Sequence, residues 1–455
     1  MRLSLQLQST TIIYRQKSFN KVTMASIIGR QDELKRLDEV YEGNIRNVYI
    51  NARPRIGASA LVKRFCEKSK FIYTTFYDST PAEAVKSFRL AIEEFQNEPV
   101  GMDNPGFPEL FHVLSRLAKE YDPIIVFDRT QYAPEEFVKQ LKWFTEDLDC
   151  MTILIGFNDS ARFDITFSDI IDLEALPRAE CNRFHPKMTA VDRLKTYMTV
   201  GGVPLYHSMM NKGDYAESVE KGFLGSYPKL VAECELMLRQ SAVPYPMCCA
   251  ILSDIANFKG RPIDIAVNQG ISRQLCDIYL KKLVEEDLIC TISPIGNSPR
   301  KPVYIVKNPL LSFYFIVIRM NPEVQAGKAD YKDIEHYADM FLEIRFRDIC
   351  TEYIRNHYDV VSIGRWWSKD EDTQKPTLCA IINVDGEQKT LIADCKFRGG
   401  KLDQGALKAF VARAEMIQDV PEKKLIMFSV SGFEDKLLKK AKAESITLVG
   451  PNEIL

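Results

Sequence analysis

The feature that most constrains this chain is an alternation of apolar runs with amphipathic segments between residues 47 and 157. The apolar runs predict strands at 47–50 (NVYI), 70–78 (KFIYTTFYD), 123–128 (PIIVFD) and 151–157 (MTILIGF). The segments between them predict helices at 58–68, 81–96, 108–121 and 134–148, and a further helix precedes them at 27–42. Continuous apolar strands separated by helices predict an α/β fold whose parallel sheet is covered on both faces.

A chain of 455 residues is long for one domain, so we expect several. Three helical segments and a two-stranded hairpin near residue 300 predict a winged helix, in which Ser272 caps the third helix. Leu275, Ile278, Tyr279 and Leu283 are expected on one face of that helix. The expected regions are an extension (1–23), an α/β core (24–175), a helical lid or linker (176–240), the winged helix (241–310) and a C-terminal α/β domain (330–455).

Composition limits the classes of function. A formal net charge of −2 gives no overall attraction to nucleic acid or to a membrane surface, so such binding would need a local patch. The sequence has no apolar run of about 18 residues, so no membrane span is expected. Its eleven cysteines are scattered without a CxxC pair, which indicates reduced thiols in the cytoplasm and argues against a disulfide framework or a zinc site.

The first 23 residues contain Arg2, Arg15, Lys17 and Lys21 and no acid. A mitochondrial presequence would look similar. No arginine-rich amphipathic face or cleavage signal is clear, however. The preferred interpretation is an extended or misassigned start, with Met24 opening the first domain.

The stretch NARPRIGASALVKRF (51–65) has the layout of a phosphate-binding loop between a strand and a helix. Such a loop follows the pattern G-x-x-x-x-G-K-[ST], in which backbone amides wrap the phosphates, the lysine adds charge and the hydroxyl binds Mg²⁺. The matching positions here are Ala52, Gly57, Ala58 and Ser59. The lysine is absent, and losing a charge-assisted contact of roughly 1.5–3 kcal/mol weakens binding about ten- to a hundredfold.

The strand at 123–128 ends in Asp128, where a Walker B strand places the aspartate that orients magnesium. Arg129 follows, at the position where a glutamate would activate water, and a guanidinium cannot act as a base at neutral pH. We therefore expect weak ATP and Mg²⁺ binding with little hydrolysis. The residues expected to bind nucleotide are Arg53, Arg55, Gly57, Ala58, Ser59 and Asp128, with Ser59 and Asp128 at the metal. Two alternatives remain: an active ATPase in which Arg53 or Arg55 replaces the lysine, and an unrelated turn.

These stretches, together with IIGRQDELKRL (27–37), ILIGFNDS (153–160) and GGVPLY (201–206), resemble a family of AAA-type P-loop ATPases found in archaea and in anaerobic bacteria such as the Bacteroidetes. In that family the loop reads G-R-R-R-[VI]-G-K-T, and the second motif reads D-E-[FL]-Q. The resemblance covers most of the chain from about residue 27. It implies an ATPase core, a winged helix and a C-terminal restriction-endonuclease-like domain of undefined function.

The C-terminal motifs of the resemblance are NPLLSFYF (308–315), MFLEIRFRDIC (340–350), IGRWW (363–367) and ADCKF (393–397). A nuclease of this fold uses acids to hold Mg²⁺ and a lysine to orient water. Glu343, Asp394 and Lys396 match three of those positions. Thr377 and Cys379 stand where the central acids would be, so the resemblance implies an impaired nuclease. The alternative is that Glu343, Asp394 and Lys396 are surface charges on an inactive scaffold.

The winged helix offers four candidate nucleic-acid contacts. Arg273 and Gln274 begin its third helix, and Arg300 and Lys301 lie in the wing, positions that can reach the major groove and phosphates. Packing of this region against the ATPase core is the competing interpretation. The Trp366–Trp367 pair could stack on bases, but such residues more often fill a core.

The sequence thus predicts an AAA-type ATP-binding protein with impaired hydrolysis and an impaired nuclease-like domain. The alternative is a non-enzymatic module that binds DNA or a protein partner through the winged helix and the C-terminal sheet.

Overall fold

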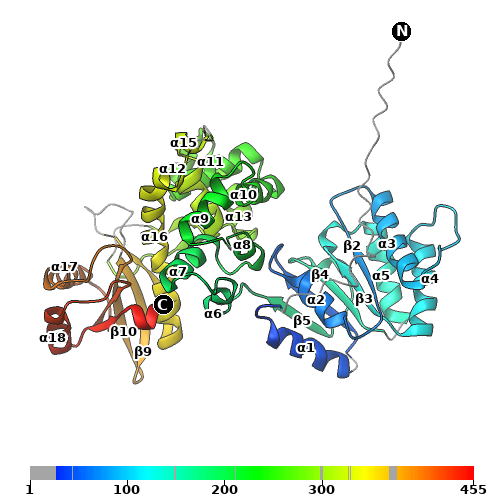
Figure 1. The fold of residues 1–455 in the computed structure, drawn as a ribbon, viewed down its shortest axis with the longest axis horizontal. Helices are drawn as coiled ribbons and strands as arrows, with labels where there is room; N and C mark the ends of the chain where they lie inside the picture. The colour runs from blue at the N-terminus through cyan, green and yellow to red at the C-terminus, as the bar shows by residue number, and fades with distance from the viewer. Residues whose placement is uncertain are drawn as a thin grey trace, which may run out of the picture. The chain divides into compact units, whose positions relative to one another are not determined.

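The structure is a computed structural model that forms two compact units, one ending at Leu173 and the other beginning at Glu174 (Figure 1). It describes residues 27–43, 45–147, 150–210, 212–297, 301–325, 327, 329–367 and 377–455. The expected N-terminal extension and the prediction about Met24 lie outside these residues. Among the described helices, none combines the length and the apolar character that crossing a membrane requires.

The first unit contains a five-stranded parallel sheet in the order β2-β3-β4-β1-β5, so the parallel-sheet prediction is confirmed. Its strands are β1 (Asn47–Ala52), β2 (Phe71–Thr75), β3 (Ile124–Asp128), β4 (Thr152–Gly156) and β5 (Asp169–Leu173). β4 lies between β1 and β3, and the sequence did not predict β5 at the sheet edge. The carboxyl ends of the central strands therefore meet at one edge, where ligands of α/β sheets bind.

Helices cover this sheet, and they agree with the predicted segments to within a few residues. They are α1 (Gln31–Glu42), α2 (Ala58–Cys66), α3 (Pro81–Gln96), α4 (Phe107–Tyr121) and α5 (Glu135–Asp147). The Thr80 hydroxyl caps α3, with Pro81 at the first helical position. α3, α4 and α5 share a core with Tyr49. Val48 and Ile50 alternate to the other face and are also fully buried, so both faces are covered.

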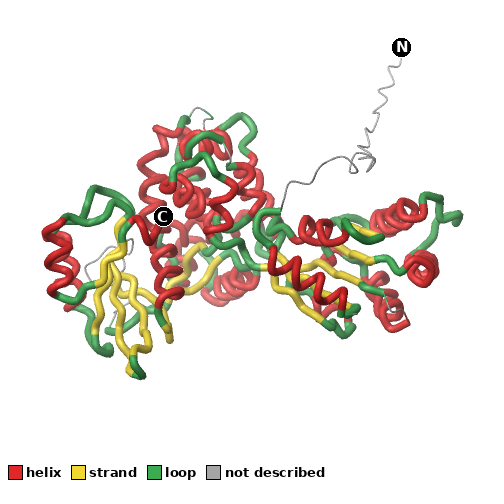
Figure 2. Tube along the Cα trace, turned by 60° about the horizontal axis from the view of Figure 1, so that its bottom comes forward, coloured by secondary structure: helices red, strands yellow, loops and turns green. Residues whose placement is uncertain are grey.

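The second unit is mostly helical and carries two further sheets. Its helices are α6 (Arg178–Cys181), α7 (Ala190–Val200), α8 (Pro204–Met209), α9 (Tyr215–Val219), α10 (Lys229–Gln240), α11 (Tyr245–Ala256), α12 (Pro262–Gln269), α13 (Arg273–Glu285), α14 (Pro309–Phe313), α15 (Pro322–Gln325), α16 (Tyr331–His357), α17 (Gln404–Glu415), α18 (Asp435–Ala443) and α19 (Pro451–Ile454). Its strands are β6 (Ile289–Ile292), β7 (Val303–Val306), β8 (Asp359–Trp366), β9 (Thr377–Val384), β10 (Glu387–Lys396), β11 (Lys423–Ser429) and β12 (Thr447–Val449). β6 and β7 form an antiparallel pair, and the others form a mixed sheet ordered β12-β11-β10-β9-β8. All strands are yellow in Figure 2.

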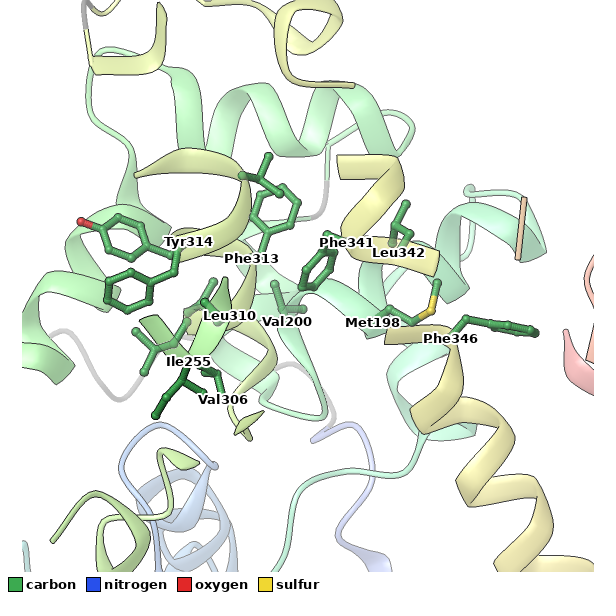
Figure 3. Close-up of a cluster of buried hydrophobic side chains, with 14 of the residues drawn as sticks. Met198, Val200, Ile255, Val306, Leu310, Phe313, Tyr314, Phe341, Leu342 and Phe346 are labelled. Carbon is green, nitrogen blue, oxygen red and sulfur yellow. The ribbon is translucent and has the colours of Figure 1, made fainter. Parts of the chain in front are cut away.

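One hydrophobic core runs through the second unit, from Leu194 to Ile454. Figure 3 shows part of it, where Phe313 and Phe341 lie between the helices. The long helix α16 contributes to this core along with one face of β10, whose Leu391 and Ala393 point toward it. The regions that the sequence separates as helical linker, winged helix and C-terminal domain therefore share a single core.

The opposite face of the mixed sheet packs against α17 and α18. Trp366 belongs to this second core and is 3% exposed, so the interpretation of Trp366 as a core residue is confirmed. Its indole Nε1 donates to Asn297 Oδ1 at 3.0 Å, and the same oxygen accepts from the backbone amide of Gln418 at 3.1 Å. Asn297 thus ties the segment after β6 to the C-terminal sheet.

The expected face of α13 is wrong in part. Its buried residues are Cys276, Leu280 and Leu283, whereas Leu275 and Ile278 are exposed. The Ser272 hydroxyl accepts from the Leu275 amide at 3.2 Å, so the predicted N-cap is confirmed. The buried residues follow the i, i+4, i+7 spacing of a helix face centred one position away from the predicted one.

The GGVPLY motif (201–206) connects α7 to α8, and a buried histidine pair, His185 and His207, lies against it. His207 Nε2 lies 2.7 Å from the carbonyl oxygen of Gly201, which can only accept, so this nitrogen carries the proton. His207 Nδ1 therefore accepts the proton of His185 Nε2, 2.8 Å away. Burial lowers the pKa of His185 to about 4 and that of His207 to about 3. Both rings are neutral at pH 7.

Acid is expected to destabilise the second unit through this pair. Both pKa values are depressed below the ordinary 6.5, so the unfolded state binds more protons as the pH falls. The stabilisation is complete above about pH 6.5 and is lost toward pH 4, by up to about 1.4 kcal/mol per pH unit for each histidine. In urea unfolding between pH 7 and pH 4, the free energy of unfolding of the His207→Gln variant should fall less steeply with pH than that of wild type. The exposed His357→Gln control should keep the wild-type slope, and equal slopes in all three proteins would contradict the assignment.

All eleven cysteines are free thiols, and ten of them are buried. The thiol pKa of Cys379 is raised to about 12, chiefly by burial, so this side chain behaves as a small apolar residue of the sheet core.

Candidate nucleotide-binding site

The loop between β1 and α2 bends through two residues with left-handed backbone. Gly57 has φ 103° and precedes α2, and Arg55 has φ 71°, which is uncommon for a residue with a side chain. Arg30 anchors the loop from outside: its Nη2 donates to the Ile56 carbonyl at 3.0 Å, and its Nη1 pairs with Glu33 at 2.8 Å. A buried guanidinium therefore fixes the loop in front of the helix.

Ser59 and Asp128 meet at the carboxyl edge of the sheet, although 69 positions separate them in the chain. Ser59 Oγ donates to Asp128 Oδ2 at 2.7 Å, and Tyr73 Oη donates to the same oxygen at 2.8 Å. Asp128 is 4% exposed, and burial followed by this carboxylate raises the pKa of Tyr73 strongly. The hydroxyl and the carboxylate predicted to share a metal thus lie in direct contact.

The helix end beside this pair is open to an anion. Gly57 supplies no side-chain hydrogen bond to the first turn of α2, and that turn contains no acid. The unpaired amides at a helix N-terminus favour a negatively charged group. Ala58 is the buried first residue of α2, and the predicted Arg53 and Arg55 lie half-buried in the preceding loop. The backbone features of a phosphate site are present without the lysine.

Arg129 directly follows Asp128 with φ 60°. Its guanidinium carbon lies 5.2 Å from the centre of the Tyr77 ring, within cation–π range. Because a guanidinium stays protonated at neutral pH, this side chain cannot take a proton from water.

A polar network closes the same edge between β1, β3 and β4. Asp159 accepts from the Tyr49 hydroxyl and from Thr130 Oγ1, the latter at 3.0 Å, while Asn51 accepts from the Asn158 amide at 3.0 Å. A methyl group on Gly156 would lie 2.8 Å from the Tyr49 oxygen and closer still to Asp159 and Thr130. Only glycine fits under this network.

Sequence reasoning missed several residues of this site: Arg30, Tyr49, Tyr73, Thr130 and Asp159. The available signal was Asn158-Asp159 directly after a buried strand, since carboxyl ends of parallel strands share one edge. Tyr73 carried no comparable signal, because an aromatic residue within a strand ordinarily indicates packing.

The nuclease-like residues lie around the end of β10 but are engaged in other contacts. Glu343 Oε2 accepts from the backbone amides of Phe397 and Arg398 at 3.2 and 3.0 Å. Asp394 is 5% exposed and pairs with Arg413 Nη1 at 3.1 Å, with Lys396 Nζ at 3.9 Å. Across the described residues, no group of three or more His, Cys, Asp or Glu side chains could hold a metal ion.

The central positions of that proposed site are apolar or buried. Thr377 is 3% exposed, and Cys379 is fully buried opposite Ile392. Neither side chain can replace a carboxylate as a ligand for Mg²⁺, which prefers charged oxygen.

Three of the four predicted nucleic-acid residues can be placed. Arg273 Nε lies 2.9 and 3.0 Å from the two carboxylate oxygens of Asp277, one turn along α13. Gln274 and Lys301 are exposed, and Arg300 lies outside the described residues. The exposed Arg273 therefore pairs with an acid on its own helix.

No protein-family model matches the chain, and no curated protein matches it. Solved structures similar to it include Cdc6p from Pyrobaculum aerophilum, at 11% identity over 72% of this chain and 98% of that chain, with a TM-score of 0.34. A STAND ATPase with a tetratricopeptide repeat sensor from Pyrococcus horikoshii is 14% identical over 72% of this chain and 49% of that chain, with a TM-score of 0.31. A structure of Drosophila ORC bound to AT-rich DNA and Cdc6 is 7% identical over 62% of this chain and 89% of that chain, with a TM-score of 0.26. Similarities at this level assign no family and no function.

Proposed function

We propose that the first unit binds ATP with Mg²⁺ weakly and hydrolyses it poorly, so that the protein acts through binding. The observation that carries this proposal is the Ser59–Asp128 hydrogen bond at the N-terminus of α2. Hydroxyl and carboxylate oxygens are hard ligands that suit Mg²⁺, and the helix amides suit the phosphates. A bound Mg²⁺ would neutralise charge on the outer phosphates, while the residues of the loop orient them.

The same residues lack two groups that ATP hydrolysis needs. Ala58 adds no charge at the outer phosphates, and Arg129 cannot accept a proton from the attacking water. Asp159 is a carboxylate of the same edge, but the hydroxyls of Tyr49 and Thr130 already donate to it. These features favour binding over hydrolysis.

Phosphate release by the full chain tests the hydrolysis part of this proposal. With saturating MgATP, wild type is expected to release no more phosphate than the Asp128→Ala variant. An ATPase rebuilt around Arg53 or Arg55 would instead release phosphate in wild type and lose it in Asp128→Ala. One of the variants Arg53→Gln and Arg55→Gln would then also release no phosphate, namely the one that removes the charge replacing the lysine.

For the second unit we propose a nuclease-like scaffold with impaired cleavage. Three observations support this proposal. Glu343 accepts hydrogen bonds from two backbone amides, and Asp394 pairs with Arg413. Cys379 is buried where a nuclease of this fold has a central acid. Both amides donate to Oε2 of Glu343, and Arg413 offsets the charge of Asp394, so these contacts compete with a metal for the carboxylate oxygens.

A non-enzymatic interaction module is the second candidate, because α12 and α13 expose apolar side chains. Ile263, Val267 and Ile278 are each about half exposed or more. Together with the Arg273–Asp277 pair, they favour a protein partner over DNA within this alternative. Binding of duplex DNA that weakens steeply with salt, and that Arg273→Gln reduces, would instead support the nucleic-acid form.

A further inference from the structure

The second unit contains a cavity that the proposed nucleotide site does not use. It has a volume of about 260 Å³ and lies between α11, β7, α16 and β8. Its floor depends on Gly260, where a methyl group would collide with the backbone of Tyr304. The backbone amide of Tyr304 donates to the Gly260 carbonyl at 2.9 Å, so the two segments are held together.

Arginines dominate the charge of the cavity wall. Arg261, Arg345, Arg347 and Arg365 line it, against two acids, Asp264 and Asp348. Arg261 is already paired, because its Nη2 donates to Asp264 Oδ1 at 2.7 Å. Of the remaining three guanidiniums, Arg345 and Arg365 share one carboxylate, that of Asp348, which is 40% exposed.

The three inner arginines differ in burial and in pairing: Arg347 is buried, whereas the side chains of Arg345 and Arg365 are 11% and 13% exposed. Arg347 is 7% exposed, and its Nη1 has no hydrogen-bond partner. Arg345 pairs with Asp348 at 3.0 Å and donates to the carbonyls of Val306 and Lys307, each at 3.4 Å, so that only its Nε lacks a partner. Arg365 lies 4.0 Å from Asp348. Burial, followed by the charges of Arg347 and Arg345, lowers the pKa of Arg365 to about 10. Buried cations of this kind are costly unless an anion pairs with them.

The rest of the wall is apolar. Ile255 and Val306, both labelled in Figure 3, line the cavity together with Ile316 and Ile344. Trp367 also lines it and is 2% exposed. A few polar groups converging in an apolar cavity are typical of small-molecule sites, although this one lies just under the usual range of roughly 300–1,000 Å³.

We propose that this cavity binds a small organic phosphate, with the phosphate held by Arg347 and Arg365 and the apolar part held against Ile255, Val306 and Trp367. Guanidinium forks match phosphate oxygens bidentately, which is why arginine and not lysine suits such a site. The volume admits a compact ligand and excludes a polynucleotide chain.

Phenyl phosphate is a suitable probe, because it joins a phosphate to one apolar ring. The loop of the first unit can also attract phosphate, so the measurement must be local. The chain has three tryptophans, of which Trp143 is the exposed one in the first unit. In the Trp143→Phe background the fluorescence therefore reports on Trp366 and Trp367 alone.

Titration with phenyl phosphate at up to millimolar concentration should change this fluorescence in a saturable way. Phenyl phosphate should bind more tightly than inorganic phosphate, and phenol should cause no change. Arg347→Gln and Arg365→Gln should each weaken binding at least about tenfold, since each removes a charge-assisted contact. The Arg355→Gln control, an exposed position on the same helix, should bind like the parent. Arg347→Lys should bind more weakly than the parent because it loses the fork.

Thermal unfolding separates lost binding from lost folding. Arg347→Gln removes an unpartnered buried charge, so the free variant should melt no earlier than its parent. The proposal is overturned if phenyl phosphate gives no saturable change, or if a folded Arg347→Gln variant binds it as tightly as the parent. Equal responses to phenyl phosphate and phenol would also overturn it.

Discussion

Replacing Ala58 with lysine is expected to strengthen MgATP binding roughly ten- to a hundredfold, the value of one charge-assisted contact of about 1.5–3 kcal/mol. Ala58 is the first residue of α2, directly after the left-handed Gly57, which is the position of the lysine in a phosphate-binding loop. The loop anchor at Arg30 and the Ser59–Asp128 pair are already in place. The new ammonium group therefore adds charge to a pocket that needs no rebuilding. Calorimetric titration of both proteins measures the change.

A matched control is available on the same helix. Ala60 is exposed one position beyond Ser59, so Ala60→Lys adds the same charge outside the loop. That variant should bind MgATP within about threefold of wild type, because an exposed charge is screened by solvent. Equal affinities for the Ala58→Lys variant and wild type, with both folded by thermal unfolding, would show that the loop is not a phosphate site.

Gly202→Ala is expected to lower the free energy of unfolding of the second unit by about 3 kcal/mol. A methyl group at Gly202 would lie 2.8 Å from the backbone nitrogen of Leu176 and closer still to its carbonyl oxygen. The two backbones are joined by the hydrogen bond from the Leu176 amide to the Gly202 carbonyl, at 2.8 Å. Because both clashing atoms belong to the main chain, no side-chain rotation relieves the contact.

Urea unfolding monitored by circular dichroism measures this loss. Gly400→Ala is the control within the same unit, since a methyl group there meets nothing within 4 Å and the backbone is not left-handed. It should change stability by no more than about 0.5 kcal/mol. A Gly202→Ala variant as stable as Gly400→Ala would mean that the chain before α6 does not pack against the GGVPLY turn.

The core of the first unit was predictable because the three central strands, β1, β3 and β4, are short apolar runs and β2 is rich in β-branched and aromatic residues. β5 was missed for a physical reason: it is an edge strand in which the exposed Ile170 and Asp172 alternate with the buried Ile171 and Leu173. Its polar face is stabilised by contacts that only the fold creates, such as the 2.8 Å hydrogen bond from Asn51 to Asp172. Local sequence carries little of that information.

The site was predictable where strand order alone brings residues together. Ser59 follows β1 and Asp128 ends β3, so both lie at the carboxyl edge of the parallel sheet, and the two sequence motifs pointed to both residues. Arg30 and Tyr73 could not be assigned, because their roles depend on how α1 and β2 close over the loop. The partner of Asp394 could not be assigned either, because Asp394 forms an ion pair with Arg413 of α17, which packs on the face of the sheet.

Titration of the full wild-type chain with a fluorescent ATP analogue, in the presence and absence of Mg²⁺, tests most directly whether the first unit is a nucleotide site. Weak saturable binding up to millimolar nucleotide is expected. Mg²⁺ should strengthen it in wild type but not in Asp128→Ala, since Asp128 and Ser59 are the oxygens placed to share the metal. No saturable binding at millimolar nucleotide, or binding that Asp128→Ala leaves unchanged with Mg²⁺ present, would contradict the assignment.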